Sequence, residues 1–116
     1  MNGSELIAAE RQRQVDAEGW TAAHDDGYVC AELVCAALGY GETAAMQIYN
    51  CVDGFEGKPD LGEPGWWPWL SEQWKPSTDP IPNLVKAGAL IAAEIDRLQR
   101  KRELEEQGRG AAVRSS

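Results

Sequence analysis

The chain has few cysteines and no long apolar run, the features that would indicate a secreted or membrane-bound protein. Among 116 residues it contains one histidine, one phenylalanine and three cysteines, an odd number that fits a reducing compartment better than a disulfide framework. No apolar run approaches the roughly 18–20 residues that a bilayer-spanning helix needs. The first residues lack the basic and then apolar pattern of a signal peptide. We therefore expect a soluble, cytoplasmic protein without a membrane partner.

Basic residues are scarce as well. The chain has 11 Lys and Arg against 19 Asp and Glu, a net charge of −8. Residues 1–78 hold 13 acidic and 4 basic residues, whereas residues 79–116 hold 6 and 7. A general nucleic-acid binder needs a basic surface, so we expect no direct binding of DNA or RNA.

Helical periodicity dominates what is present, and no strand or internal repeat is apparent. The sequence predicts an all-α fold, a small helical bundle forming a single domain over residues 1–108, with a disordered tail over 109–116. Ser4 is the expected cap of the first helix and Gly19 its stop. The other expected helices cover residues 28–40, a shorter continuation over 42–52, and 83–108 between Asn83 as cap and Gly108 as stop.

The last of these helices carries a heptad-like apolar stripe. Its members recur with a four-three-four-three spacing: Leu84, Gly88, Ile91, Ile95 and Leu98. Small residues at 87–89 allow a close helix neighbour. A chain of this size buries a modest share of its surface by itself. The stripe therefore predicts a homo-oligomer joined through residues 84–98.

Residues 53–82 contain all six prolines and four of the five tryptophans, namely Trp66, Trp67, Trp69 and Trp74. Proline density predicts a long loop with at most one short helical turn around Leu70–Gln73. A loop of this length is uncommon in a small domain unless it has a function. We expect some tryptophans to anchor the loop on the helices and others to border a ligand pocket.

Two sets of residues have the chemistry to bind a metal ion. His24, Asp25 and Asp26, with Glu32 further on, could hold a divalent cation, although the same residues suit a helix start. A Cys₃His zinc set is complete by count, with Cys30, Cys35 and Cys51 joining the histidine. The two cysteines on one helix lie about 140° apart around its axis, so buried free cysteines are the favoured interpretation.

Cationic side chains on the predicted helices are candidate anion contacts: Arg11, Arg13, Lys86 and Arg97. Arginine forks suit phosphates, and tryptophan faces suit nucleobases. The alternative is that each arginine pairs with a nearby glutamate or aspartate on its own helix. No nucleophile motif or phosphate-binding glycine loop is present, so the sequence offers no support for nucleophilic catalysis.

Four segments together resemble a group of small phage and prophage proteins of unassigned function. They are AAERQRQVDAEGWTAAHDD, ELVCAALGY, WPWLSEQWKPSTDP and NLVKAGALIAAEIDRL, and the match covers roughly residues 8–40 and 66–98. The chain departs from the group's pattern at Ala23, where a glutamate is common, and in a longer middle segment. The resemblance implies a phage protein acting inside an infected bacterial host.

The chain is more loosely similar to the all-α, MazG-like nucleotide pyrophosphohydrolases, whose helices carry paired acidic residues for magnesium. Here Glu32 is followed by Cys35, and Glu94 by Arg97, so neither acidic pair is complete. The similarity implies a nucleotide-binding relative of that fold better than it implies a hydrolase.

From these observations we expect a phage protein that binds a small anionic, nucleotide-type ligand without a cofactor, as an anti-defence sponge that sequesters a host nucleotide immune signal would. The expected ligand-binding residues are Arg11, Arg13, Trp20, Trp67, Trp69, Trp74, Lys75 and Arg97. The first alternative is a pyrophosphohydrolase using Mg²⁺ or Mn²⁺ held by His24, Asp25, Asp26, Glu32 and Glu94. The second is an acidic inhibitor that binds a host protein through its tryptophans.

Overall fold

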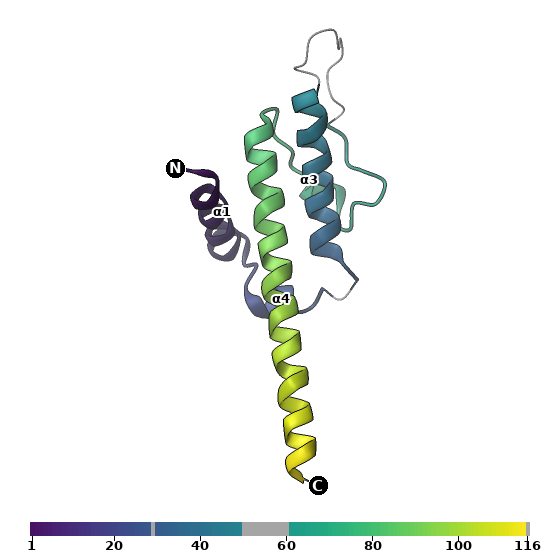
Figure 1. The fold of residues 1–116 in the computed structure, drawn as a ribbon. Helices are drawn as coiled ribbons and strands as arrows, with labels where there is room; N and C mark the ends of the chain where they lie inside the picture. Colours follow the sequence, from purple (N-terminus) through teal and green to yellow (C-terminus); the bar gives the residue numbers. More distant parts are fainter. Residues whose placement is uncertain (29, 50–60, 116) are drawn as a thin grey trace.

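The computed structural model describes residues 1–28, 30–49 and 61–115, with side chains through residue 109. Within these residues the fold is all-helical, as expected, and contains no strand (Figure 1). The α-helices are α1 (Gly3–Glu18), α2 (Ala22–Asp25), α3 (Glu32–Tyr49) and α4 (Pro80–Ser115), and a short 3-10 helix, η1, covers Ser71–Gln73. In the described part of the chain, no helix combines the length and apolar character needed to cross a membrane.

Helix α1 begins one residue before the expected cap. Asn2 is the N-cap: its side chain accepts a hydrogen bond from the Glu5 N–H, and the Glu5 carboxylate accepts one from the Asn2 N–H. This reciprocal capping box satisfies two free backbone donors, which the Ser4 hydroxyl alone would not do. Gly19 ends the helix as predicted, with a left-handed φ of 73°.

The central helix α3 corrects the predicted division into two helices. It runs without a break from Glu32 to Tyr49, through Gly39 and Gly41, and starts four residues later than expected. Gly39 lies inside the helix, where the absence of a side chain lets Pro64 and Trp74 pack close to the backbone. A Cβ at this position would lie 3.2 Å from both the Pro64 and the Trp74 side chains.

Residues 61–79 contain only η1, as the proline pattern predicts, while residues 50–60 of the expected loop, with Cys51, lie outside the described residues. Helix α4 begins at Pro80, so Asn83 is not its cap. Asp79 accepts the Ile81 N–H instead, and prolines are tolerated in a first helical turn, where the N–H groups have no helical partner.

Helix α4 also continues past the expected stop at Gly108 and reaches Ser115, so the predicted tail is helical through that residue. Residues beyond about 100 extend away from the rest of the molecule (Figure 1). Glycine lowers helix stability without forbidding helix, and no proline follows to stop it.

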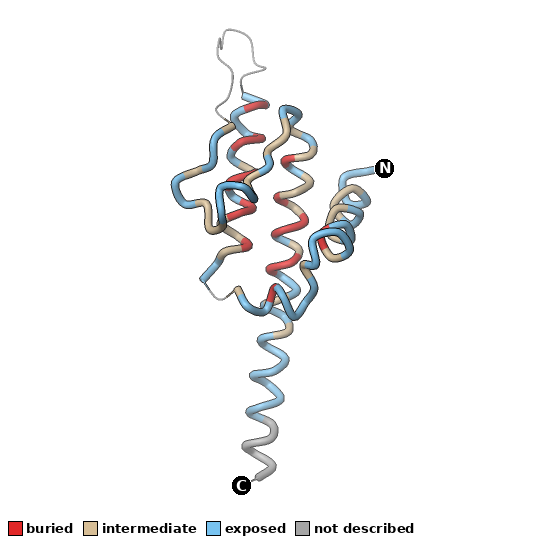
Figure 2. Tube along the Cα trace, turned by 180° about the vertical axis from the view of Figure 1, so that it is seen from behind, coloured by how far each residue is buried: buried red, intermediate tan, exposed pale blue. Residues whose placement is uncertain are grey.

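The core lies between α3 and α4, which run antiparallel, and α1 packs across α4 (Figure 2). Most of its members are small: Leu33, Ala36, Ala37, Tyr40, Ala87, Leu90 and Ala93. Asn83 is fully buried at the end of this interface, where it donates hydrogen bonds to the Gln47 side chain and the Ser77 carbonyl and accepts one from the Ser77 N–H. These bonds tie α3, the 61–79 segment and α4 together.

Candidate functional site

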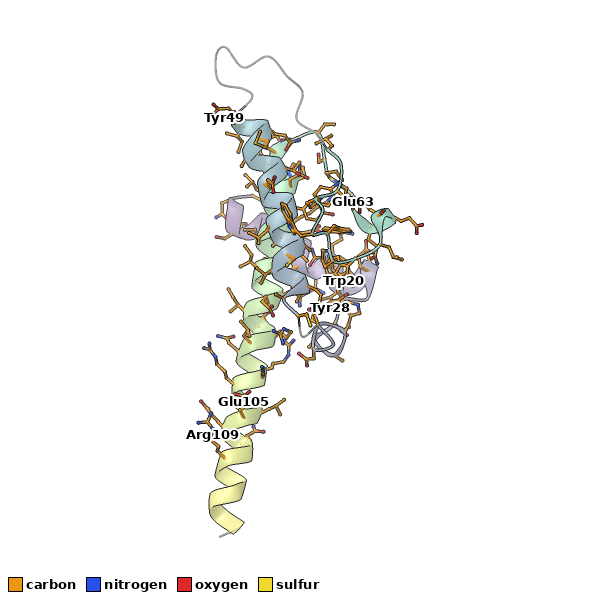
Figure 3. The ribbon with its side chains drawn as sticks, turned by 90° about the vertical axis from the view of Figure 1, so that its right-hand side faces the viewer. Trp20, Tyr28, Tyr49, Glu63, Glu105 and Arg109 are labelled. Atoms are coloured by element: carbon orange, nitrogen blue, oxygen red, sulfur yellow. The ribbon has the colours of Figure 1, made fainter. Side chains whose placement is uncertain are left out.

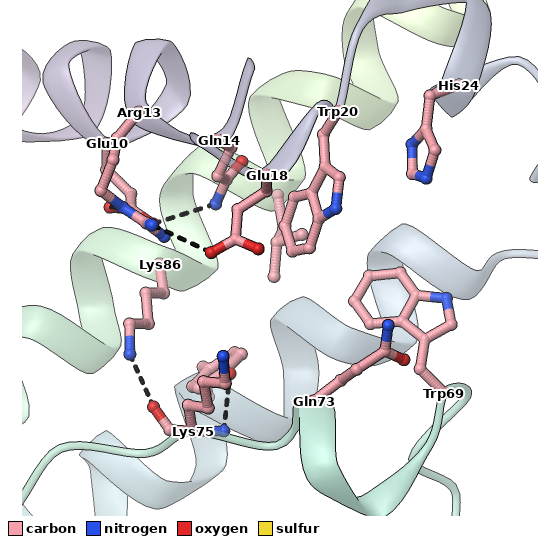
Figure 4. Close-up of a pocket in the computed structure, with 12 residues that line it drawn as sticks. Glu10, Arg13, Gln14, Glu18, Trp20, His24, Trp69, Gln73, Lys75 and Lys86 are labelled. Atoms are coloured by element: carbon pink, nitrogen blue, oxygen red, sulfur yellow. Dashed lines mark hydrogen bonds and ion pairs between the residues drawn. The ribbon is translucent and has the colours of Figure 1, made fainter. Parts of the chain in front are cut away.

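A cavity of about 310 Å³ lies where α1, the Trp20–His24 turn, the 61–79 segment and α4 converge (Figure 4). Its volume is at the lower end of the range for small-molecule sites. The lining residues are Glu10, Arg13, Gln14, Glu18, Trp20, His24, Tyr40, Trp69, Gln73, Lys75, Lys86 and Leu90. We call this the Trp20–Lys86 cavity.

One wall of the cavity is aromatic. Trp20 follows the left-handed Gly19, which turns the chain back over α1. Its ring lies 5.7 Å from that of Trp69, with a 50° tilt, and stacks nearly parallel to the His24 ring at 6.3 Å. Figure 3 shows Trp20 and Tyr28 on the same side of α3 and α4 as the 61–79 segment. These rings offer apolar faces to a planar group.

The opposite wall is cationic. Lys75 projects from the 61–79 segment and Lys86 from α4, and the Lys86 ammonium donates to the Lys75 carbonyl at 2.6 Å and lies 5.3 Å from the Tyr40 ring centre. Burial lowers the pKa of Lys86 more than the nearby Glu10 carboxylate raises it. Its positive charge is therefore only partly compensated, and an anion beside it would be stabilised.

Arg13 completes this wall but is already engaged. Its guanidinium binds Glu10 at 2.6 Å and Glu18 at 3.1 Å. Burial tends to raise the pKa of Glu10, but the hydrogen bond and charge of Arg13 outweigh it, and the pKa stays below its ordinary value. With Lys75 and Lys86, the lining residues carry three cationic and two anionic side chains. The cavity is thus net positive in a chain whose charge is −8.

Two polar atoms beside the cavity lack a hydrogen-bond partner in the described structure: Oε1 of Gln14 and the indole Nε1 of Trp69. Gln14 is only 2% exposed, and its amide nitrogen donates to Glu10. Leaving a buried donor or acceptor unsatisfied costs about 1–3 kcal/mol. Both atoms are covered in this structure, so a ligand in the cavity would reach them only after a rotation of the Gln14 or Trp69 side chain.

Two of the expected ligand-binding tryptophans, Trp67 and Trp74, do not line this cavity. Their indole N–H groups donate to the backbone carbonyls of Leu70 at 3.0 Å and Leu61 at 2.8 Å, respectively. The Trp74 ring stacks on Tyr40 at 4.6 Å, and the Trp67 ring meets the same tyrosine edge-on. Both rings fasten the 61–79 segment to α3.

Arg11 is held by a buried network on the other side of the Trp20 turn. Its guanidinium binds Asp25 at 2.8 Å and the Trp20 carbonyl at 3.2 Å. Asp25 is 1% exposed and also lies 3.3 Å from Nδ1 of His24, whose Nε2 lies 3.4 Å from the Tyr28 hydroxyl. This network fixes α2 against α1. Of the neighbouring candidate metal ligands His24, Asp25 and Asp26, His24 lines the cavity and the two aspartates do not.

The remaining acidic residues of the alternative metal set lie in separate contacts. Asp26 binds Arg100 at 2.8 Å, Glu94 pairs with Arg97, and Glu32 accepts a backbone N–H near the start of α3. The Glu94 hydrogen bond is the main reason that the pKa of Arg97 is raised. Arg97 is not among the residues that line the Trp20–Lys86 cavity.

Apart from the neighbouring His24 and Asp25, the described candidate metal ligands lie in separate contacts. Cys30 is exposed and Cys35 half-buried, while Cys51 lies outside the described residues. Within residues 1–28, 30–49 and 61–115, no three His, Cys, Asp or Glu side chains are grouped so that they could hold a metal ion.

Of the residues expected to bind ligand, the structure brings Arg13, Trp20, Trp69 and Lys75 to one cavity. Lys86 was a candidate anion contact on sequence, and the structure places it beside them. Gln14 and Gln73 were not expected. Gln14 lies on the buried side of α1, four residues after Glu10, but no sequence signal separates such a glutamine from a surface residue. No protein-family model, curated protein or solved structure matches the chain.

Proposed function

We propose that the protein binds a small, anionic, nucleotide-type ligand in the Trp20–Lys86 cavity. The observation that carries the proposal is the pairing of an aromatic wall, Trp20 and Trp69, with a cationic wall, Lys75 and Lys86, across one cavity. A nucleotide has the same two parts, a planar base and a charged phosphate. Base stacking on an aromatic side chain contributes about 1–3 kcal/mol per base.

In this arrangement the base lies against Trp20 and Trp69, and the phosphate lies between the two lysines. The anion compensates the charge of Lys86, so binding raises the pKa of this lysine. Gln14 and Trp69 supply an acceptor and a donor for the polar edge of the base after a side-chain rotation, because both atoms are covered in the free protein.

The setting of this activity comes from the resemblance to small phage proteins. In an infected bacterial host, a protein that binds a nucleotide immune signal and leaves it intact would act as an anti-defence sponge. Such a role needs a binding cavity and no catalytic groups. The proposal accordingly assigns no catalytic residue and no metal to the cavity.

Isothermal titration calorimetry with a panel of mononucleotides and cyclic nucleotides, with and without Mg²⁺ or Mn²⁺, tests the proposal. Chromatography of ligand recovered after heating the complex shows whether it is intact. We expect at least one nucleotide to bind without metal and to be recovered unchanged. Metal-dependent cleavage would establish the pyrophosphohydrolase instead, and no binding by any nucleotide would refute the proposal.

Matched variants locate the site. Lys75→Ala and Trp69→Leu should each weaken binding at least about tenfold, since the loss of one charge-assisted contact or one stacking face is about 1.4 kcal/mol or more. Lys101→Ala and Trp66→Leu remove the same residue types outside the cavity. These two controls should keep the wild-type affinity.

A further inference from the structure

Helix α4 places its small apolar residues inside and its large ones outside. Towards α3 it buries Ala87 and Ala93 around a single large residue, Leu90. Its exposed large residues include four members of the predicted stripe: Leu84 at 46%, Ile91 at 48%, Ile95 at 51% and Leu98 at 37%. A large part of the apolar surface of these four side chains therefore stays in water in the single chain, which is unfavourable.

Helix α3 carries a second stripe of the same kind, which sequence inspection did not reveal. Val34, Leu38, Gly41, Ala45 and Ile48 recur with the four-three-four-three spacing of the α4 stripe. Leu38 is 58% exposed and Ile48 is 49% exposed. A repeat of this kind is typical of helices that pack along their length against another helix.

The two stripes lie on the same side of the helix pair. On α3 the exposed stripe begins at Val34, one residue after buried Leu33, and on α4 it begins at Leu84, one residue after buried Asn83. One residue turns a helix by about 100°. Each exposed stripe is therefore rotated by the same angle from the side that faces the other helix. Because α3 and α4 are antiparallel, these equal rotations bring both stripes to the same face of the helix pair. In Figure 1 no other segment crosses in front of these two helices.

This α3–α4 apolar face consists of Val34, Leu38, Gly41, Ala45 and Ile48 on α3 and Leu84, Ile91, Ile95 and Leu98 on α4. Gly88, the remaining member of the α4 stripe, lies at the edge of the face, where Ile7 of α1 packs against it. None of the nine residues of the face carries a charge. A partner must therefore supply apolar helices with a matching repeat, and the same face of another copy does so. We infer that a second copy of this chain packs on the α3–α4 apolar face, forming a two-fold symmetric dimer with a four-helix layer.

The projected area of the face is close to the lower limit for a stable dimer interface. Helix α3 has 18 residues, or about 27 Å at the usual rise, and packed helices lie about 10 Å apart. Two such helices present on the order of 500 Å² in projection, and the relief of the side chains raises the accessible area above that value. Stable interfaces bury about 600–1,000 Å² per partner. Gly41 and Ala45 also allow the facing helices to approach closely.

The dimer does not depend on the proposed ligand. The cavity is bordered by the 61–79 segment, which lies behind α3 and α4 in Figure 1 and in front of them in Figure 2. Dimer formation and nucleotide binding are therefore separate properties. The failure of one leaves the other standing, because each is measured by a different method.

Sedimentation equilibrium of the full chain, from about 1 to about 100 µM, tests the inference. The wild type should show twice the chain mass of 12.7 kDa. Ile91→Glu and Leu38→Glu each place a charge on the face and should shift the protein to the 12.7 kDa species. Both positions are exposed in the single chain, so the helical circular dichroism should be retained.

Leu104→Glu is the matched control, since Leu104 is 66% exposed on the same helix but lies beyond the face. This variant should sediment like the wild type. A wild type that stays monomeric throughout the range would overturn the inference and favour a different protein partner. An assembly that survives Ile91→Glu and Leu38→Glu would also overturn it, because contacts would then lie elsewhere.

Discussion

The ion pair between the partly exposed Arg11 and the buried Asp25 gives the sharpest test of the structure. Asp25 is 1% exposed, so Arg11→Met leaves its carboxylate in the interior with only the weak His24 contact at 3.3 Å. Breaking a buried pair by removing one partner costs about 3–5 kcal/mol. That is a large part of the roughly 5–15 kcal/mol by which domains are stable.

Urea unfolding followed by tryptophan fluorescence, at equal protein concentration for all variants, measures this cost. Arg13→Met is the control, because the Arg13 side chain is 47% exposed and a surface pair contributes at most about 1 kcal/mol. The double variant that combines Arg11→Met with Asp25→Asn should recover part of the loss, since the buried charge is then gone. If Arg11→Met costs no more than the Arg13 control, the buried pair does not hold α2 against α1.

Two further predictions concern α1. A Cβ at Gly88 would lie 2.6 Å from the Ile7 Cδ1, so Gly88→Ala should lower the free energy of unfolding of the wild type. In an Ile7→Ala background the same substitution should raise it by up to about 1 kcal/mol, because alanine favours helix. An effect of the same sign in both backgrounds would contradict this contact. The lowered pKa of Glu10 stabilises the fold above the ordinary glutamate pKa of about 4.3, and this contribution is lost as the pH falls through the folded-state value. Glu10→Gln should therefore lose less stability than the wild type between about pH 4.5 and pH 3 in urea unfolding, whereas identical pH profiles would contradict the pairing with Arg13.

The predicted elements that agree with the structure are those set by local chemistry. Gly19 ends α1 because a left-handed residue satisfies the last carbonyls, and the dense prolines keep residues 61–79 free of α-helix. The predictions that were wrong concern helix ends where a neighbouring residue could also act as the cap. Asn2 and Asp79 cap their helices in place of Ser4 and Asn83, which are equally plausible caps by residue type.

The candidate site shows the same division. The chemistry of tryptophan and of the cationic residues was sufficient to predict them as ligand-binding groups. It did not distinguish Trp69, which lines the cavity, from Trp67 and Trp74, which anchor the 61–79 segment. Arg11 and Arg13 are two residues apart on α1 and so point about 160° apart around the helix axis. One consequently meets buried Asp25 and the other meets the cavity.

The sequence by itself determined that the described part of this chain is mostly helical, that residues 61–79 contain no α-helix, and that α4 carries an apolar stripe, because caps, prolines and periodicity act over a few residues. Tertiary structure decided which stripe is buried. Alanines let α3 and α4 approach through Ala36, Ala87 and Ala93, with Leu33, Tyr40 and Leu90 beside them in the core, and this packing leaves the stripe residues Leu38, Ile48, Leu84, Ile91, Ile95 and Leu98 exposed on one face. It also brought Trp20, Trp69, Lys75 and Lys86, which lie up to 66 positions apart, around one cavity. Such proximity depends on how the helices pack, which no local pattern records.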